Sequence, residues 1–196
     1  MAADDLAELR AAARGRDWSA LQTALARLFF QMDFYAALEL AVTRLHDFLP
    51  VFERHHPEAT WPRRLLVSVV AYGRAPDALP PEASQTYASP GAANFLSGLF
   101  DLLRCLEQRT PLENRLRFAA SAVSNALLAG LAADWYDQHP DAWAEQQARG
   151  DDPDPETGGT VRQRIYARFW LDAITAERDT AAWLALADAI ERKLSA

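Results

Sequence analysis

Apolar side chains recur at the spacing of an α-helix through nearly the whole chain. The clearest case follows Asp33, where apolar residues alternate at steps of four and three: Phe34, Leu38, Ala41, Leu45, Phe48 and Phe52. Such a stripe lies on one face of a helix and packs against a core. β-branched residues, which favour strands, form only one short run, at 67–70. The pattern predicts an all-α fold: an irregular helical bundle of about eight helices in a single domain, 1–196.

Two helix starts carry capping-box signatures. Thr110 and Glu113 flank Pro111, which is favoured at the first helical position, and the segment that follows is apolar on most sides. We therefore predict a long central helix near 111–136. Thr160 and Gln163 have the same spacing and predict the start of a later helix.

Prolines and acidic residues mark the predicted interruptions. Pro50 lies within the apolar stripe of 34–52, so we expect a kink or a break there. The segment 74–89 contains three prolines and no sustained apolar period. The segment 150–159 is acidic, contains two prolines and lacks large apolar residues. We predict irregular loops at 74–89 and 150–159.

Charge and hydropathy exclude several classes of protein. The chain has 20 basic and 27 acidic residues, a formal net charge of −7, which disfavours binding to nucleic acid. No run approaches about 18 consecutive apolar residues, so we expect no membrane span. The residues Met1 to Arg10 do not resemble a signal peptide, and the single cysteine, Cys105, excludes an intramolecular disulfide. These features predict a cytoplasmic protein.

No motif points to a reaction. The sequence has no Gly-x-Ser-x-Gly elbow, no glycine-rich phosphate loop and no Cys-x-x-Cys pair, so we assign no catalytic residue and no cofactor. One metal site is a candidate, because Asp134, Asp137 and His139 cluster within six residues. The alternative is that polar residues collect there because the long helix ends before Pro140.

Three polar residues interrupt the most apolar helix: Ser121, Ser124 and Asn125. Buried polar side chains need hydrogen-bond partners, so these residues could line a ligand-binding pocket or bond to a neighbouring helix. They could also face water in a strip with Asn114 and Arg117. All three interpretations remain open at this point.

The sequence resembles no particular family, and three functions are consistent with it. The first is a non-enzymatic helical scaffold that binds a protein or peptide partner in a groove between helices. The second is a helical bundle that binds a small molecule or a metal, and that could be an enzyme. The third is a structural subunit of a homo-oligomer. The lack of a catalytic constellation favours the first.

Overall fold

The computed structural model describes residues 2–76, 78–175 and 177–195, with side chains described for 2–76, 78–172 and 180–195. Across these ranges the chain forms nine α-helices and one 3₁₀-helix, without strands, and 77% of it is helical. The predicted all-α bundle is confirmed, with one helix more than the approximate number expected. The helices are α1 (Ala2–Gly15), α2 (Trp18–Phe29), α3 (Phe34–His55), α4 (Trp61–Tyr72), η1 (Pro81–Ser84), α5 (Ala92–Leu106), α6 (Leu112–Gln138), α7 (Pro140–Arg149), α8 (Val161–Thr175) and α9 (Glu177–Leu194).

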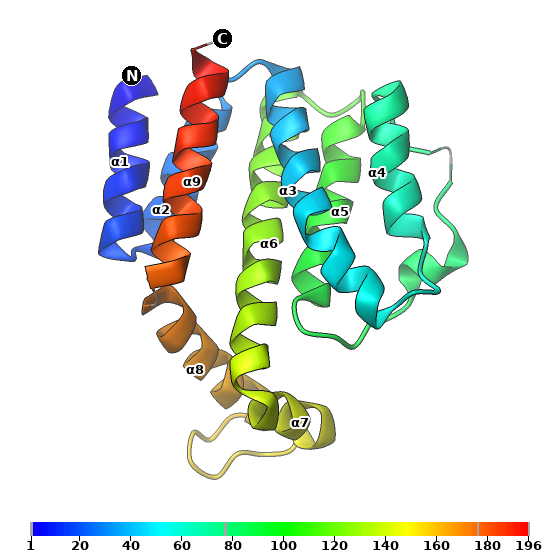
Figure 1. Ribbon diagram of the computed structural model, residues 1–196, viewed down its shortest axis with the longest axis vertical. Coiled ribbons are helices and arrows are strands. Elements are labelled where there is room, and N and C mark those ends of the chain that lie inside the picture. Colours follow the sequence, from blue (N-terminus) through cyan, green and yellow to red (C-terminus); the bar gives the residue numbers. More distant parts are fainter. Residues whose placement is uncertain (1, 77, 176, 196) are drawn as a thin grey trace.

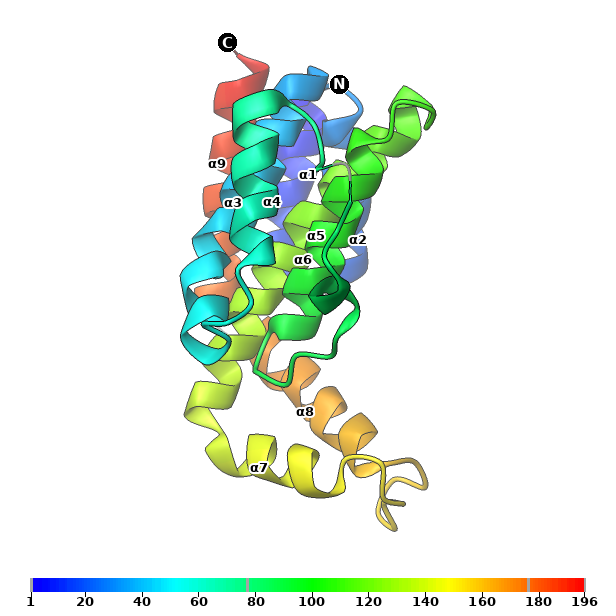
Figure 2. The same cartoon turned by 90° about the vertical axis from the view of Figure 1, so that its right-hand side faces the viewer.

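The long helix α6 occupies the centre of the bundle, as predicted from its apolar composition. In Figure 1, α1, α2 and α9 lie on one side of α6, and α3, α4 and α5 lie on the other. Helices α7 and α8 form the end of the molecule opposite the two termini (Figure 2). Segments from both ends of the chain therefore meet around one helix.

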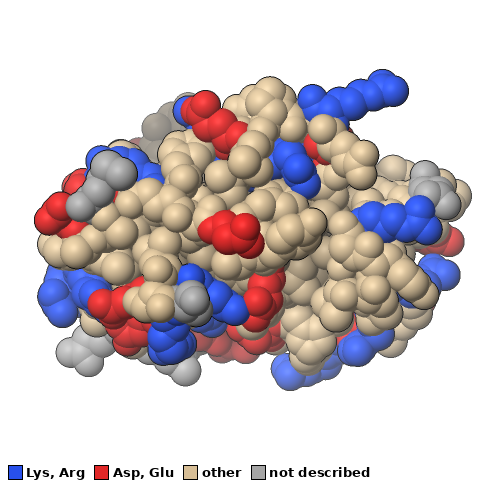
Figure 3. Space-filling view, turned by 90° about the horizontal axis from the view of Figure 1, so that it is seen from above, with Lys and Arg blue, Asp and Glu red and all other residues tan. Residues whose placement is uncertain are grey.

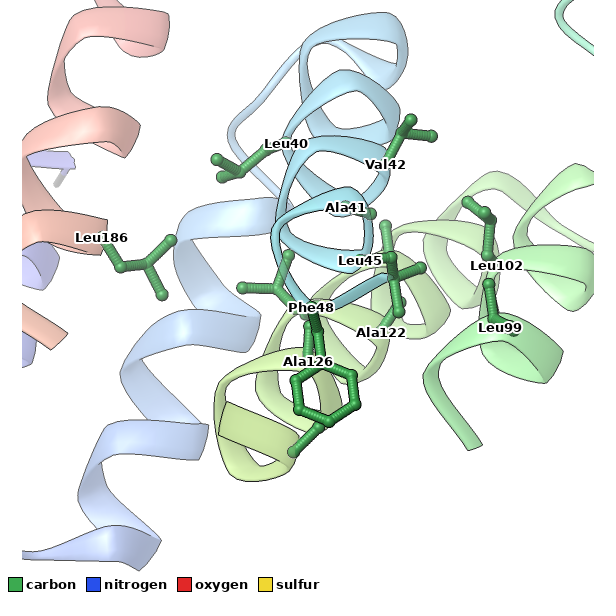
Figure 4. Close-up of a cluster of buried hydrophobic side chains, with 14 of the residues drawn as sticks. Leu40, Ala41, Val42, Leu45, Phe48, Leu99, Leu102, Ala122, Ala126 and Leu186 are labelled. Atoms are coloured by element: carbon green, nitrogen blue, oxygen red, sulfur yellow. The ribbon is translucent and has the colours of Figure 1, made fainter. Parts of the chain in front are cut away.

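The main core depends on small residues of α6. Ala122 and Ala126 are buried and lie beneath Leu45 and Phe48 of α3 (Figure 4). On α5, Gly98 is so close to α6 that an added Cβ would lie 3.2 Å from the carbonyl oxygen of Ala122. Small side chains let helices approach closely, and the larger residues of the neighbouring helices fill the space between them.

A second, aromatic cluster joins the lower end of α6 to α8. Trp135 and Tyr136 of α6 are buried with Ile165 and Phe169 of α8. The rings of Trp135 and Phe169 meet edge to face, with centroids 5.8 Å apart. This cluster attaches α7 and α8 to the bundle.

Local capping signals define several helix ends. Asp17 accepts a hydrogen bond from the N–H of Ala20, and Asp33 accepts from Tyr35 and Ala36. The capping box at Thr160 is formed in both directions: Thr160 Oγ1 accepts from the N–H of Gln163, and Gln163 Oε1 accepts from the N–H of Thr160. The start of α8 was thus predicted from sequence.

Two of the local predictions are wrong. The capping box at Thr110 does not form: Pro111 is the N-cap residue of α6, and the hydroxyl of Thr110 instead donates to the carboxylate of Glu107. A break at Pro50 is absent, because α3 continues through this residue to His55. Buried side chains on both sides of the proline, Leu49 and Phe52, hold the helix against the core.

The two threonines allow a matched test of capping. We expect Thr160→Ala to lower the free energy of unfolding by about 1 kcal/mol, because the N–H of Gln163 loses its acceptor. Thr110→Ala should change it by less than about 0.5 kcal/mol, because Thr110 caps no N–H group. Urea unfolding of both variants measures the difference, and equal effects would contradict the assigned caps.

The loop between α7 and α8 is organised by one buried carboxylate. Asp154 is 5% exposed and accepts hydrogen bonds from the N–H of Glu156 and the hydroxyl of Thr157, at 3.2 and 3.0 Å. Arg164 Nε lies 3.0 Å from its Oδ2 atom. Burial raises the pKa of Asp154, but these three partners outweigh it and hold the pKa below the ordinary value of 3.8.

This arrangement predicts a pH dependence. A carboxylate with a lowered pKa stabilises the fold above its unfolded pKa, and this contribution is lost as the pH falls through the folded value. Asp154→Asn should therefore be less stable than wild type at neutral pH, and the gap should shrink below about pH 4. Urea midpoints at several pH values measure it. Asp151→Asn, whose side chain is 92% exposed, is the control and should show little gap at any pH.

Candidate functional site

The polar residues of α6 connect it to α5. The hydroxyl of Ser121 donates to Asp101 Oδ2 at 2.6 Å, and the amide of Asn125 donates to the same atom at 3.1 Å. The Asp101 side chain is only 13% exposed, and Arg104 lies 3.6 Å from its other oxygen. Ser124 is buried at 6% exposure. Ser121 and Asn125 therefore bond to a neighbouring helix, as one of the three interpretations proposed, and their role as ligand-binding residues remains a prediction.

The three residues of the candidate metal site are not brought together. Asp134 and Asp137 are exposed, whereas the His139 ring stacks on Trp135, with centroids 4.4 Å apart. The Nδ1 atom of His139 is 2.8 Å from the carbonyl oxygen of Trp135. Within the described part of the chain, no three His, Cys, Asp or Glu side chains are placed to hold a metal ion. Of the three, Asp134 lines a groove described below.

Cys105 is buried in α5. Burial raises the pKa of its thiol to about 11, an effect that nearby Arg115 partly offsets. The thiol is therefore protonated at neutral pH and unreactive as a nucleophile.

A serine and a histidine meet where α3 ends. The hydroxyl of Ser89 lies 3.0 Å from Nε2 of His56, and Glu58 lies 3.9 Å from Nδ1. Burial lowers the pKa of His56, opposed by Glu58 and assisted by His55, so the ring is neutral at physiological pH. This resembles a nucleophile and its base. However, Ser89 is only 7% exposed and His56 packs against the rings of Phe52 and Tyr87, so the contact anchors the loop before α5.

An open groove runs between α3, α6 and α9, which face one another in Figure 1. Its volume is about 410 Å³. Its walls and floor are mostly apolar, and three charged residues line it; the full lining is Arg44, Asp47, Phe48, Val51, Ala126, Leu127, Gly130, Leu131, Asp134, Ala181 and Ala182. We call it the α3–α6–α9 groove.

The groove exists because small residues lie where three helices meet. Ala126 and Gly130 form part of its floor, and Ala181 and Ala182 form the wall from α9. A Cβ built on Gly130 would meet nothing within 4 Å, so the protein's own packing does not require a glycine there. Glycine in a helix interior is less stable than alanine by about 0.5–1 kcal/mol.

Gly130→Ala should therefore raise the free energy of unfolding, by about 0.5–1 kcal/mol. Gly98→Ala is the contrasting variant, because its Cβ would lie 2.8 Å from Cδ2 of Leu45 and should destabilise the fold. Both are measured by urea unfolding. A loss of stability in Gly130→Ala would contradict the open space above the groove floor.

Arg44 is the groove residue with an unmet hydrogen bond. Its Nη1 atom is 3.3 Å from Asp47. Its Nε atom is buried and has no hydrogen-bond partner among the described residues. A buried donor without an acceptor is unfavourable by about 1–3 kcal/mol.

Large apolar side chains are exposed along α4 and the start of α3. Val67, Val70, Tyr72 and Tyr35 are 58%, 74%, 72% and 73% exposed. Two hollows flank Val70, with volumes of about 250 and 300 Å³, and both lie between α3 and α4. We call these four side chains and the two hollows the α3–α4 surface. Because the opposite face of α4 packs on the core through Leu65, Leu66 and Val69, this helix is apolar on both sides.

Charge around the α3–α4 surface differs from that of the whole chain. Helix α4 contains Arg63 and Arg64 and no acidic residue. Arg63 is paired with Glu53 of α3 through two hydrogen bonds, of 2.7 and 2.5 Å, which lower the pKa of Glu53. On the end of the molecule that carries both termini, acidic and basic side chains are intermixed (Figure 3).

Helix α6 is the one described helix with the length and hydropathy of a membrane span. Its most apolar window has a mean hydropathy of 1.4, and 61% of that window is buried inside the bundle. The central helix of a helical bundle has the same properties, so the finding is weak evidence for a membrane.

Comparisons with known proteins give no assignment. No protein-family model matches the sequence, and neither the curated proteins nor the solved structures compared with it show a significant match.

Proposed function

We propose that this protein is a non-enzymatic helical scaffold that binds a protein partner through its α3–α4 surface. The observation that carries the proposal is the exposure of Tyr35, Val67, Val70 and Tyr72 on adjacent helices. Contiguous apolar surface of this kind is typical of a site where another protein docks.

The shape of the surface fits a partner helix. A helix that lies along two antiparallel helices places side chains of one face into the hollows between them. Here the hollows on either side of Val70 would receive apolar side chains of the partner, and Val70 would pack between them. The aromatic rings of Tyr35 and Tyr72 add large contact area at little cost in conformational entropy.

Charge indicates the composition of that helix. Arg63 and Arg64 lie on the exposed side of α4, which lacks acidic residues. A partner helix with acidic residues beside its apolar face would be attracted to them, and one with basic residues would be repelled. The proposed partner is therefore an amphipathic helix with an acidic flank.

The test begins with photo-crosslinking in the source cells. A photoreactive phenylalanine replaces Tyr72 in one variant and Tyr166, on α8 and 52% exposed, in the control. The expected result is a polypeptide captured from position 72 and not from position 166, with an acidic amphipathic helix in its sequence.

Binding of the purified partner is then compared in two variants. Val70→Asp should weaken binding at least about tenfold, because it puts a charge in the centre of the surface. Leu171→Asp is the matched control, because Leu171 is a 70% exposed apolar residue on α8. Equal effects of the two variants would overturn the proposal. Dimerisation that Val70→Asp abolishes would instead identify a second copy of the chain as the partner.

A further inference from the structure

The α3–α6–α9 groove is distinct from the α3–α4 surface. Helix α3 contributes to both, but with different faces. Arg44, Phe48 and Val51 line the groove, whereas Val42 and His46 line the hollows beside α4. At about 410 Å³ and with a mostly apolar lining, the groove has the size and character of a small-molecule site.

We propose that this groove binds a mainly apolar, uncharged small molecule whose carbonyl oxygen accepts a hydrogen bond from Nε of Arg44. The buried Nε–H group has no acceptor among the described residues. An acceptor brought by a ligand would satisfy it, while the hydrocarbon part of the ligand covers Leu127, Leu131 and Phe48.

The charged residues of the groove determine the head group. Arg44 contributes one positive charge and Asp47 and Asp134 two negative charges, so the lining has a net charge of −1. A carboxylate ligand would gain from Arg44 but would be repelled by both aspartates. An ammonium ligand cannot accept a hydrogen bond and would be repelled by Arg44. An amide, ester or ketone carbonyl meets neither difficulty.

Gly130 gives independent support for an occupant. The fold does not require a glycine at this position, because a Cβ there would meet nothing within 4 Å. Yet a glycine lowers the stability of a helix interior. A ligand that lies directly on the backbone of α6 would account for it, because a side chain at this position would occupy the space of the ligand.

The test compares three probes that share a chain and differ in the head group: octanamide, octanoate and octylammonium. Each is titrated into the full chain by isothermal titration calorimetry. We expect octanamide to bind at one site with an affinity at least about tenfold higher than either charged probe, since one hydrogen bond to a charged group is worth about that factor. Absence of saturable octanamide binding below about 1 mM, or tighter binding of either charged probe, would overturn the proposal.

Three variants locate the site. Arg44→Met should lower the affinity for octanamide about tenfold and remove the preference for the amide over the carboxylate. Gly130→Leu should abolish binding, and Gly130→Ala should weaken it several-fold while the midpoint of thermal unfolding rises, which shows that the chain is folded. Val70→Asp, outside the groove, should leave octanamide binding unchanged. Because Val70→Asp removes the proposed protein partner and Arg44→Met the proposed ligand, failure of one proposal is distinguishable from failure of the other. Octanamide binding that is unaffected by Arg44→Met and Gly130→Leu would place the ligand elsewhere and overturn the inference.

Discussion

Gly91→Ala should lower the free energy of unfolding by about 3–5 kcal/mol, which is a large part of the stability of an ordinary domain. Gly91 is the N-cap residue of α5 and has a φ of 78°, in the left-handed region where an L side chain is strained by about 1–2 kcal/mol. An added Cβ would also overlap the carbonyl oxygen of Ala129 on α6 and would lie 2.8 Å from Cζ of Phe48. The backbone of α6 cannot move away without disturbing its contacts with α3 and α5.

Gly73→Ala separates strain from overlap. Gly73 ends α4 with a φ of 62°, and a Cβ there would meet nothing within 4 Å. This variant should therefore lose only the strain energy, about 1–2 kcal/mol. Urea unfolding of both variants gives the comparison. If Gly91→Ala loses no more stability than Gly73→Ala, the close approach of the start of α5 to α6 is wrong.

Helix ends were predictable where the signal is local. Asp33 and Thr160 cap helices through atoms within three residues in the chain, and such contacts form whatever the tertiary structure. The long helix α6 was predictable because an apolar segment of that length has to be buried.

The local predictions failed where another interaction competes with them. The carboxylate of Glu107 takes the hydroxyl of Thr110, and Pro111 becomes the N-cap in its place. At Pro50 the penalty for a proline inside a helix is about 3 kcal/mol, and the burial of several large side chains of α3 offsets it.

The candidate sites depend on contacts between distant segments, which no single-sequence pattern provides. Ser121 and Asn125 were recognised as unusual in an apolar helix, but their partner, Asp101, lies on another helix. The groove combines Arg44 with Gly130 and Ala182, residues separated by many turns of chain. One signal was present for the α3–α4 surface: Val67 and Val70 continue the apolar character of α4 beyond its buried face. A helix apolar on both faces has to be covered on both.

Phe52→Ala should lower the free energy of unfolding by about 3–5 kcal/mol, the usual range for deletion of a buried phenylalanine ring. Phe52 is 0% exposed. Its ring centroid lies 5.1 Å from that of Phe95 on α5 and 5.2 Å from that of Tyr87 in the loop before α5. The ring thus joins the end of α3, the loop and α5, so its loss leaves a cavity that no single side chain can fill.

The loop gives this prediction a second measurement. Tyr87 accepts a hydrogen bond from Nε1 of Trp61 at 3.3 Å and donates to the carbonyl of Glu82 at 2.9 Å, so the loop depends on the position of its ring. In Phe52→Ala, amide hydrogens of 85–91 should exchange faster than the global loss of stability alone explains. Tyr35→Ala, which removes a ring that is 73% exposed, should change stability by less than about 0.5 kcal/mol. Unaltered exchange of 85–91 in Phe52→Ala would mean that Tyr87 is held by its hydrogen bonds alone, and that Phe52 does not couple the loop to α3.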